Sequence, residues 1–216
     1  MITIFTTAKP FLNEIEIIQR NAILSWKKLK PECEIILFGK EPGAREIARE
    51  TGIIHIPEVK KNEYGTPLIN DMFEKAQNLA KNKILAYVNA DIILMKDFLE
   101  AISRIKLEKF LMVGRRWDVD IKERINFNSD WQEEIKEKIK KEGILHGPAG
   151  IDYFIFPKGI WLEIPPFALG RTLWDNWLLY KVWLSNILLI DATRAITIAH
   201  QNHKAHIPQG HKNDVW

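Results

Sequence analysis

The segment Asn89-Ala90-Asp91 is the most informative polar segment of the chain, because it directly follows the apolar run 84–88. Such a run is typical of a strand buried on both faces of a parallel sheet. A carboxylate at its end has no packing role there. It can bind a divalent cation, with the Asn89 amide as a neutral oxygen ligand. Asp91 also suits a cap of the following turn, since Asp and Asn are favoured in turns.

Histidines gather near the end of the sequence, where four of the six follow an apolar run at 195–198. They are His200, His203, His206 and His211. Neutral imidazole is a common metal ligand, so histidines just after a strand can complete a metal site. Pro208 and Gly210 argue against one long helix that would align all four. Solvated histidines without a ligand are the alternative interpretation.

Paired arginines, Arg115 and Arg116, follow the predicted strand 110–114. Their planar guanidinium groups suit the recognition of phosphate or carboxylate groups. A surface ion-pair network with the nearby Asp118 and Asp120 explains the same residues equally well. The pair therefore predicts either an anion site or a local cluster of salt bridges.

Two further carboxylates stand beside features that suit a ligand site. Asp152 follows a glycine-rich loop, which lets the backbone approach a ligand closely. It is a candidate for holding substrate hydroxyl groups, or it simply ends the loop. Asp175 lies between Trp174 and Trp177, an arrangement that sugar-binding clefts often require. The alternative is that Asp175 stabilises the N-terminus of a helix.

The elements that must position these residues alternate between strand and helix in the first half. Apolar runs predict strands, and apolar residues at helical spacing predict the helices between them. Strands are expected at 2–6, 34–38, 53–56 and 84–88, and helices at 12–29, 42–52 and 67–79. Thr66 is expected to cap the last of these helices, with Pro67 at its first position. This order indicates an α/β protein with a mostly parallel sheet.

In open parallel sheets, ligands bind beyond the carboxyl ends of the strands. Besides Asp91, this rule selects Thr6 and Thr7 after the first strand, and Phe38 and Gly39 after the second. We therefore expect these residues to border the same edge of the sheet.

The second half is less regular. Helices are expected at 97–105, 131–143 and 174–183, and strands at 110–114, 152–156, 187–190 and 195–198. Capping boxes at 129–132 and 172–175 predict where the last two helices begin. The glycine-rich stretch 143–150 marks only a weak internal boundary, so one domain is expected.

The composition restricts the class of protein. The chain has 216 residues, 46% of them apolar, and a net charge of +3, which is too small for a nucleic-acid-binding footprint. The single cysteine, Cys33, excludes an internal disulfide and a cysteine-built metal site. No apolar run reaches the ~18 residues of a membrane span, and no signal peptide is recognised, so a cytoplasmic protein is expected. Lysine-rich helices leave a peripheral association with a membrane open.

With these residues in place, the chain resembles nucleotide-sugar-dependent glycosyltransferases of the GT-A type, most strongly over 2–118 and more loosely over 146–203. Such enzymes carry an Asp-x-Asp signature, and the matching segment here has Asn89 in place of the first aspartate. The resemblance implies a single GT-A-like domain with a Rossmann-like, mostly parallel sheet flanked by helices. Residues 1–118 would form the nucleotide-sugar-binding half, and 119–216 a smaller, mixed acceptor-side half.

The resemblance also implies a reaction, the transfer of a sugar from a nucleoside diphosphate sugar to a hydroxyl group of a saccharide or other acceptor. Asp91 would hold Mn²⁺ or Mg²⁺ on the diphosphate, with His200 and then His203 as the best matches to a late histidine ligand. If the reaction inverts the sugar, Asp175 is the first candidate for the catalytic base and Asp152 the second. The donor would contact Thr6, Thr7, Phe38, Gly39, Asn89, Arg115 and Arg116.

Other classes of function remain as alternatives. A nicotinamide-dependent oxidoreductase needs a Gly-x-Gly-x-x-Gly turn after the first strand, where this chain has Thr6-Thr7-Ala8-Lys9-Pro10. A nucleotidyltransferase of similar fold usually carries a glycine-rich basic loop there, for which only Lys9 is present. A metal-dependent hydrolase would combine Asp91 with the late histidines. A non-catalytic sugar-binding module would use the tryptophan clusters.

Overall fold

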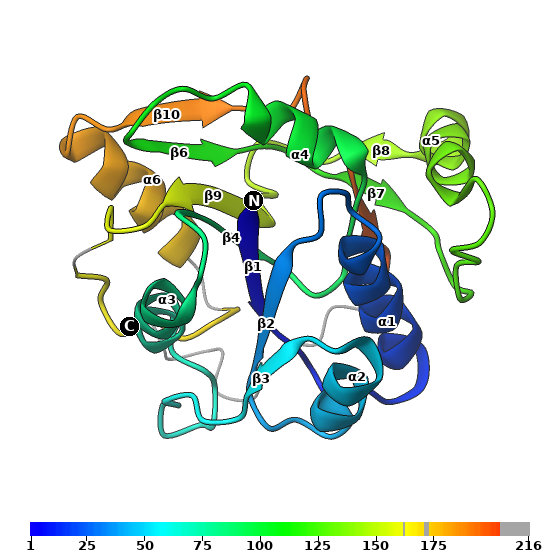
Figure 1. Cartoon of the computed structure of the whole chain (residues 1–216), viewed down its shortest axis with the longest axis horizontal. Coiled ribbons are helices and arrows are strands. Elements are labelled where there is room, and N and C mark those ends of the chain that lie inside the picture. The colour runs from blue at the N-terminus through cyan, green and yellow to red at the C-terminus, as the bar shows by residue number, and fades with distance from the viewer. Residues whose placement is uncertain (162, 171–172, 204–216) are drawn as a thin grey trace.

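Seven strands form the larger sheet of the computed structural model, which describes residues 1–161, 163–170 and 173–203. Their spatial order is β10-β6-β9-β4-β1-β2-β3 (Figure 1). The strands are β1 Ile2–Thr7, β2 Glu34–Phe38, β3 Ile54–Ile56, β4 Ile84–Val88, β6 Phe110–Val113, β9 Tyr153–Pro157 and β10 Leu188–Asp191. Every neighbouring pair is parallel except the two that β9 makes with β4 and β6. The prediction of an α/β protein with a mostly parallel sheet is confirmed.

A second sheet of four strands packs beside the first, in the order β5-β11-β7-β8. The strands are β5 Ile92–Leu94, β11 Ile198–Gln201, β7 Trp117–Val119 and β8 Ile144–Leu145. The predicted strand at 195–198 was wrong, because Ala195 and Ile196 donate their backbone N–H groups to Ala192 O in a turn. His200 therefore lies within a strand rather than after one.

The described residues form six helices, and five of them cover the two faces of the larger sheet (Figure 1). The six helices are α1 Asn13–Lys27, α2 Ala44–Thr51, α3 Ile69–Leu79, α4 Lys96–Ser103, α5 Trp131–Glu142 and α6 Trp174–Leu184. Trp26 of α1, Ile47 of α2 and Phe98 of α4 belong to one buried core cluster. Met72 of α3 and Leu178 of α6 belong to the cluster on the opposite face. Helix α5 packs against the smaller sheet through its buried stripe.

Two predicted helix caps do not form, since neither α3 nor α5 has a side-chain hydrogen bond at its N-cap. Pro67 pairs with Lys61 in an isolated bridge, so α3 begins later than predicted, at Ile69. At the start of α5, the Ser129 hydroxyl donates to Asn126 O, and the Gln132 side chain accepts from the Lys96 N–H. The third predicted cap involves residue 172, which lies outside the described residues.

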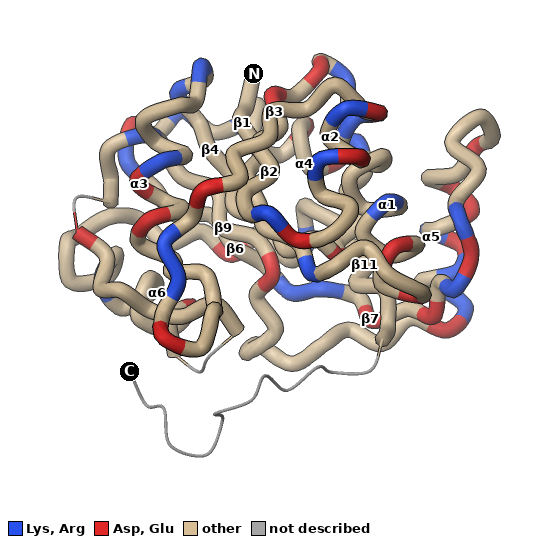
Figure 2. Tube along the Cα trace, turned by 90° about the horizontal axis from the view of Figure 1, so that it is seen from below, with Lys and Arg blue, Asp and Glu red and all other residues tan. Residues whose placement is uncertain are grey.

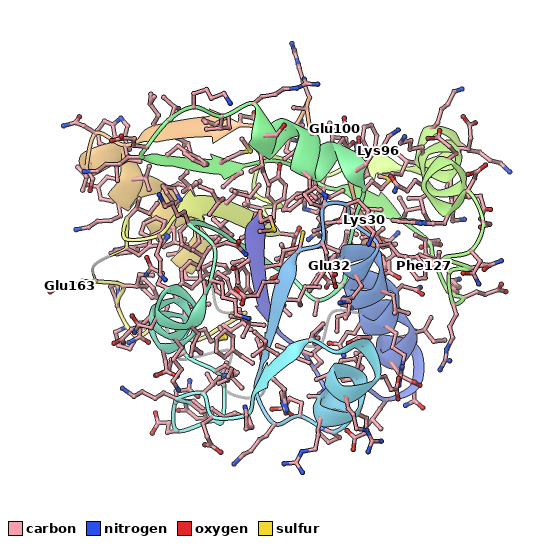
Figure 3. The ribbon with its side chains drawn as sticks, in the orientation of Figure 1. Lys30, Glu32, Lys96, Glu100, Phe127 and Glu163 are labelled. Atoms are coloured by element: carbon pink, nitrogen blue, oxygen red, sulfur yellow. The ribbon has the colours of Figure 1, made fainter. Side chains whose placement is uncertain are left out.

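Charged side chains project outward from the helices and loops that surround the sheet. Figure 3 shows this for Lys96 and Glu100, which are both exposed on α4, and for the exposed Glu163 after β9. In the described part of the chain, no helix combines the length and apolar character needed to cross a membrane.

Helix α1 fixes the strand that follows Asp91. The fully buried Trp26 donates its indole N–H to Ile92 O at 2.9 Å, and the Ser25 hydroxyl accepts from the Leu94 N–H at 3.1 Å. Both contacts lock β5 against α1. The segment that directly follows Asp91 therefore has a fixed position.

We expect Trp26→Phe to lower the free energy of unfolding by about 1–3 kcal/mol, since it removes a buried hydrogen bond and leaves a small void. Chemical denaturation measures this difference. Trp183→Phe is the matched control, because Trp183 is 68% exposed and should tolerate the change. Equal stability of the two variants would contradict the role given to Trp26.

Candidate functional site

Three candidate metal ligands meet at the carboxyl end of β4. Asp91 follows this strand, His200 lies in β11, and His203 lies just beyond it. One ligand atom from each residue lies within 4.8 Å of the other two. The Asp91 Oδ2 atom is 3.1 Å from His203 Nε2 and 3.7 Å from His200 Nε2. The structure thus brings together residues that are more than 100 positions apart in the sequence.

Gln201 holds the histidine strand against Asp91. Its backbone N–H and its side-chain amide both donate to Asp91 O, at 3.2 and 3.1 Å. The same amide nitrogen donates to Ile18 O, and the side-chain oxygen of Gln201 accepts from the Asn21 side-chain amide. Because Gln201 is fully buried, these bonds fix the neighbouring His200 relative to Asp91. Sequence analysis missed this role, which no local pattern signals.

The electrostatic environment of Asp91 suits a bound cation. Burial raises the pKa of this carboxyl group, but contacts with His200 and His203 outweigh burial and hold the pKa well below its usual range. Asp91 is therefore charged at neutral pH. Its Oδ1 atom is buried and has no hydrogen-bond partner among the residues that the structure describes. An unpartnered, buried, charged oxygen beside two imidazoles fits a divalent metal ion.

Asp118 of β7 contacts the metal-ligand cluster through His200. Its Oδ1 atom lies 3.1 Å from His200 Nδ1 and accepts a hydrogen bond from Arg116, while its Oδ2 atom is 2.6 Å from His146 Nδ1. Burial opposes the charged form, but His146 and Arg116 still keep the pKa of Asp118 below its usual value. His200 Nδ1 forms no hydrogen bond with the described residues, so Asp118 acts on this ring through its negative charge at 3.1 Å.

We therefore expect Asp118→Asn to weaken Mn²⁺ binding about 10- to 100-fold, because it removes the negative charge beside His200. Calorimetric titration with Mn²⁺ measures the effect. Asp120→Asn is the matched control, since the Asp120 carboxylate contacts Asn202 instead of a histidine. Unchanged Mn²⁺ affinity in Asp118→Asn would show that Asp118 does not act on His200.

Asp152 is joined to two other predicted site residues. It is 4% exposed, and its two oxygens accept hydrogen bonds from Asn89 at 2.6 Å and from Arg116 at 2.8 Å. Burial and then the charge of Asp91 raise the pKa of Asp152, against the opposing influence of Arg116. The pairing of Val88 with Tyr153 places Asp152 beside the end of β4.

A cleft of about 480 Å³ opens beside the metal-ligand cluster. Its walls come from the ends of β1 and β4, the N-terminal part of α1, the segment before α3 and the start of α6. Among the predicted site residues, the cleft is lined by Thr7, Asn89, Asp91, His203 and Trp174. Lys9, Gln19, Glu41 and Tyr87 line it as well and were not assigned to the site from the sequence.

Other predicted donor-binding residues lie behind the cleft wall. Thr6 is buried and donates its hydroxyl hydrogen bond to Thr7 O. Phe38 is a core residue whose carbonyl accepts from the Thr7 hydroxyl, and Gly39 accepts from the His55 ring at 2.8 Å. Thr6 and Phe38 therefore hold Thr7 in place through hydrogen bonds.

The remaining predicted residues are placed as follows. The Arg115 guanidinium donates to the backbone carbonyls of Leu145 and His146. Asp175 is half-buried in the first turn of α6, directly after the cleft residue Trp174, and it accepts a hydrogen bond from its neighbour Asn176. The late histidines at 206 and 211 fall outside the described residues.

Comparisons with known proteins support the fold. No protein-family model matches the sequence, and no curated protein matches it either. Many solved structures match, and three of them are similar to 88–97% of this chain. TarS 1-349 of S. aureus has a TM-score of 0.57 and 13% identity, and 60% of it is covered. The mannosyltransferase PcManGT of Pyrobaculum calidifontis, solved with GDP-Man and Mn²⁺, has a TM-score of 0.55 and 12% identity, with 58% covered.

A third structure is a nucleotide-diphospho-sugar transferase, described as putative, from Desulfovibrio desulfuricans G20, with a TM-score of 0.54, 8% identity and 78% of its length covered. The chain thus spans about three-fifths of the length of the first two structures. At these identities the similarity concerns the fold alone. The expected GT-A-like fold is confirmed.

Proposed function

We propose that this chain transfers a sugar from a nucleoside diphosphate sugar to a hydroxyl acceptor with the assistance of a divalent cation. The observation that carries the proposal is the cluster of Asp91, His200 and His203, two of which, Asp91 and His203, line a cleft of about 480 Å³. The cluster lies beyond the carboxyl ends of parallel strands, where α/β proteins bind their ligands. The GT-A-like fold, and the GDP-Man and Mn²⁺ in one similar structure, support the choice of donor and cation.

The cation would be held by Asp91, His200 and His203. Two imidazoles in the donor set favour Mn²⁺ over Mg²⁺, which takes mainly oxygen ligands. When bound, the cation supplies a Lewis acid that stabilises the negative charge of the departing diphosphate. The Asn89 amide nitrogen donates to Asp152, so only its amide oxygen could bind the cation or the donor.

The donor would occupy the cleft between β1 and α6. Thr7 and Asn89 offer polar groups along its floor, and Tyr87 and Trp174 offer aromatic surface. Lys9 adds a positive charge near the diphosphate position. The contacts of Arg115 and Arg116 with the diphosphate remain a proposal. In this structure, the two guanidinium groups bind carbonyl and carboxylate groups of the chain itself.

The acceptor would approach from the side of α6. We assign the removal of the acceptor proton, in an inverting reaction, to Asp175. Asp152 is the second candidate, but both of its oxygens already accept hydrogen bonds. Trp174 is buried against Tyr87, with ring centroids 5.5 Å apart, so little of its ring is open to a sugar.

The test is turnover with a panel of UDP-, GDP- and dTDP-sugars in the presence of Mn²⁺. Water serves as the acceptor when the natural one is absent, so release of nucleoside diphosphate is the readout. We expect release from one class of donor, and its loss when EDTA is added. Absence of release with every donor, together with transfer of a nucleotidyl group to a sugar phosphate, would favour the nucleotidyltransferase alternative.

A further inference from the structure

Exposed apolar side chains are concentrated at one end of the molecule, where α6 meets the edge strand β10 (Figure 1). We call these residues the α6–β10 patch: Tyr180, Trp183, Leu184, Leu188 and Leu189. Trp183 is 68% exposed and Leu188 is 57% exposed. The patch supplies five of the twelve large hydrophobic residues that are exposed in the described part of the chain. Such a concentration marks an interaction surface, whereas single exposed apolar residues do not.

The α6–β10 patch runs along α6 and around the edge of β10, where Leu189 lies on the face that α6 covers and Leu188 on the opposite face. Tyr180, Trp183 and Leu184 recur at the spacing of one helix face, and the rings of Tyr180 and Trp183 stack with centroids 6.0 Å apart. The buried residues Leu178 and Val182 attach the opposite face of α6 to the sheet. Among the described residues strand β10 pairs with β6 alone, which leaves its outer edge open. The five side chains of the patch are exposed and are not buried by other described residues.

Three lysines lie next to the patch. Lys181 lies on α6, three residues before Leu184, and Lys106 and Lys109 precede the strand β6 that pairs with β10. Within the described ranges, none of these lysines forms an ion pair with a carboxylate, although Glu108 lies between two of them. Figure 2 shows how few charges α6 itself carries in comparison with α5.

We propose that the α6–β10 patch binds the surface of a membrane that contains anionic lipids. Tryptophan and tyrosine rings prefer the boundary between lipid headgroups and acyl chains, where one end of the ring is apolar and the other is hydrated. Leucines add apolar area below them, and lysines bind the anionic headgroups. Peripheral binding requires both contributions, and this surface provides both. The proposal is independent of the donor, the acceptor and the reaction.

Vesicle flotation tests the proposal with the whole chain and without any nucleotide. Vesicles of phosphatidylcholine are compared with vesicles that also contain phosphatidylglycerol. We expect the protein to float with the anionic vesicles and to be released by high salt. The double variant Trp183→Glu/Leu188→Glu should reduce the bound fraction at least about tenfold, since it places charges in the apolar contact. Lys106→Glu/Lys109→Glu should lower binding about tenfold or more as well.

Ile144→Glu is the matched control, because Ile144 is 70% exposed on β8 of the other sheet. This variant should float like the unchanged protein, and circular dichroism should show that all variants are folded. Failure of the unchanged protein to float with either kind of vesicle would overturn the proposal. So would equal flotation of Trp183→Glu/Leu188→Glu. A dimer that this double variant separates, without vesicle binding, would instead identify the patch as an interface between two copies.

Discussion

Asp91→Asn is expected to abolish Mn²⁺-dependent binding of nucleoside diphosphate and to lower sugar transfer about a thousandfold. The variant keeps the size of the side chain but removes the negative charge that His200 and His203 both face. A Lewis acid contributes several kcal/mol to such a reaction, and ~1.4 kcal/mol corresponds to a tenfold change in rate. Electron paramagnetic resonance of free Mn²⁺ measures metal binding directly, and nucleoside diphosphate release measures transfer.

Asp130→Asn is the control for this variant, because Asp130 lies at the start of α5 and its side chain forms no cap hydrogen bond. It should bind Mn²⁺ and release product like the unchanged protein. If Asp91→Asn kept full Mn²⁺ affinity, the metal would have to lie elsewhere, and the site assignment would be wrong.

Asp175→Asn is expected to lower kcat by about 10²- to 10⁴-fold, the usual contribution of a general base. The affinity for nucleoside diphosphate should not change, because this residue is placed on the acceptor side. Asparagine can still accept the hydrogen bond that Asp175 Oδ1 receives from the Asn176 N–H, so the start of α6 should remain intact. Steady-state kinetics, combined with calorimetry of nucleotide binding, separates the two effects.

The neighbouring Asn176→Ala is the control, since Asn176 is exposed in the same helical turn. Full activity of Asp175→Asn would remove this residue from the reaction. If Asp152→Asn then lost kcat while its nucleotide affinity stayed normal, Asp152 would be the base. A loss of nucleotide affinity in Asp152→Asn would instead show that Asp152 positions Asn89 and Arg116.

The sequence predicts the larger sheet well, because its strands carry local signals. The apolar runs at 34–38 and 84–88 end at Gly39 and Asn89, and the observed strands β2 and β4 have these same bounds. The smaller sheet carries no comparable signal. Strands β5, β7 and β8 have two or three residues each, which is too short for an alternating pattern. Their pairing depends on tertiary contacts, such as the bond from Trp26 to Ile92.

The residues of the candidate site also divide into those with a local sequence signal and those without one. Asp91 was identified from its place after a buried strand, and His200 and His203 from their order in the chain. Asp118 was considered only as a partner of the arginines, although it contacts His200 and His146. Gln201 gave no signal, because its function is to bridge α1 and β4 in three dimensions. Residues that support a ligand through tertiary contacts escape analysis of local patterns.

We propose that Asp91, His200 and His203 form a metal-dependent nucleotide site. Calorimetric titration of the unchanged protein with UDP and with GDP, each with and without Mn²⁺, is the decisive experiment. We predict that one of the two nucleotides binds with Mn²⁺ and that its affinity falls at least about tenfold without it. Binding of neither nucleotide in the presence of Mn²⁺, or equal binding with and without the metal, would contradict the claim.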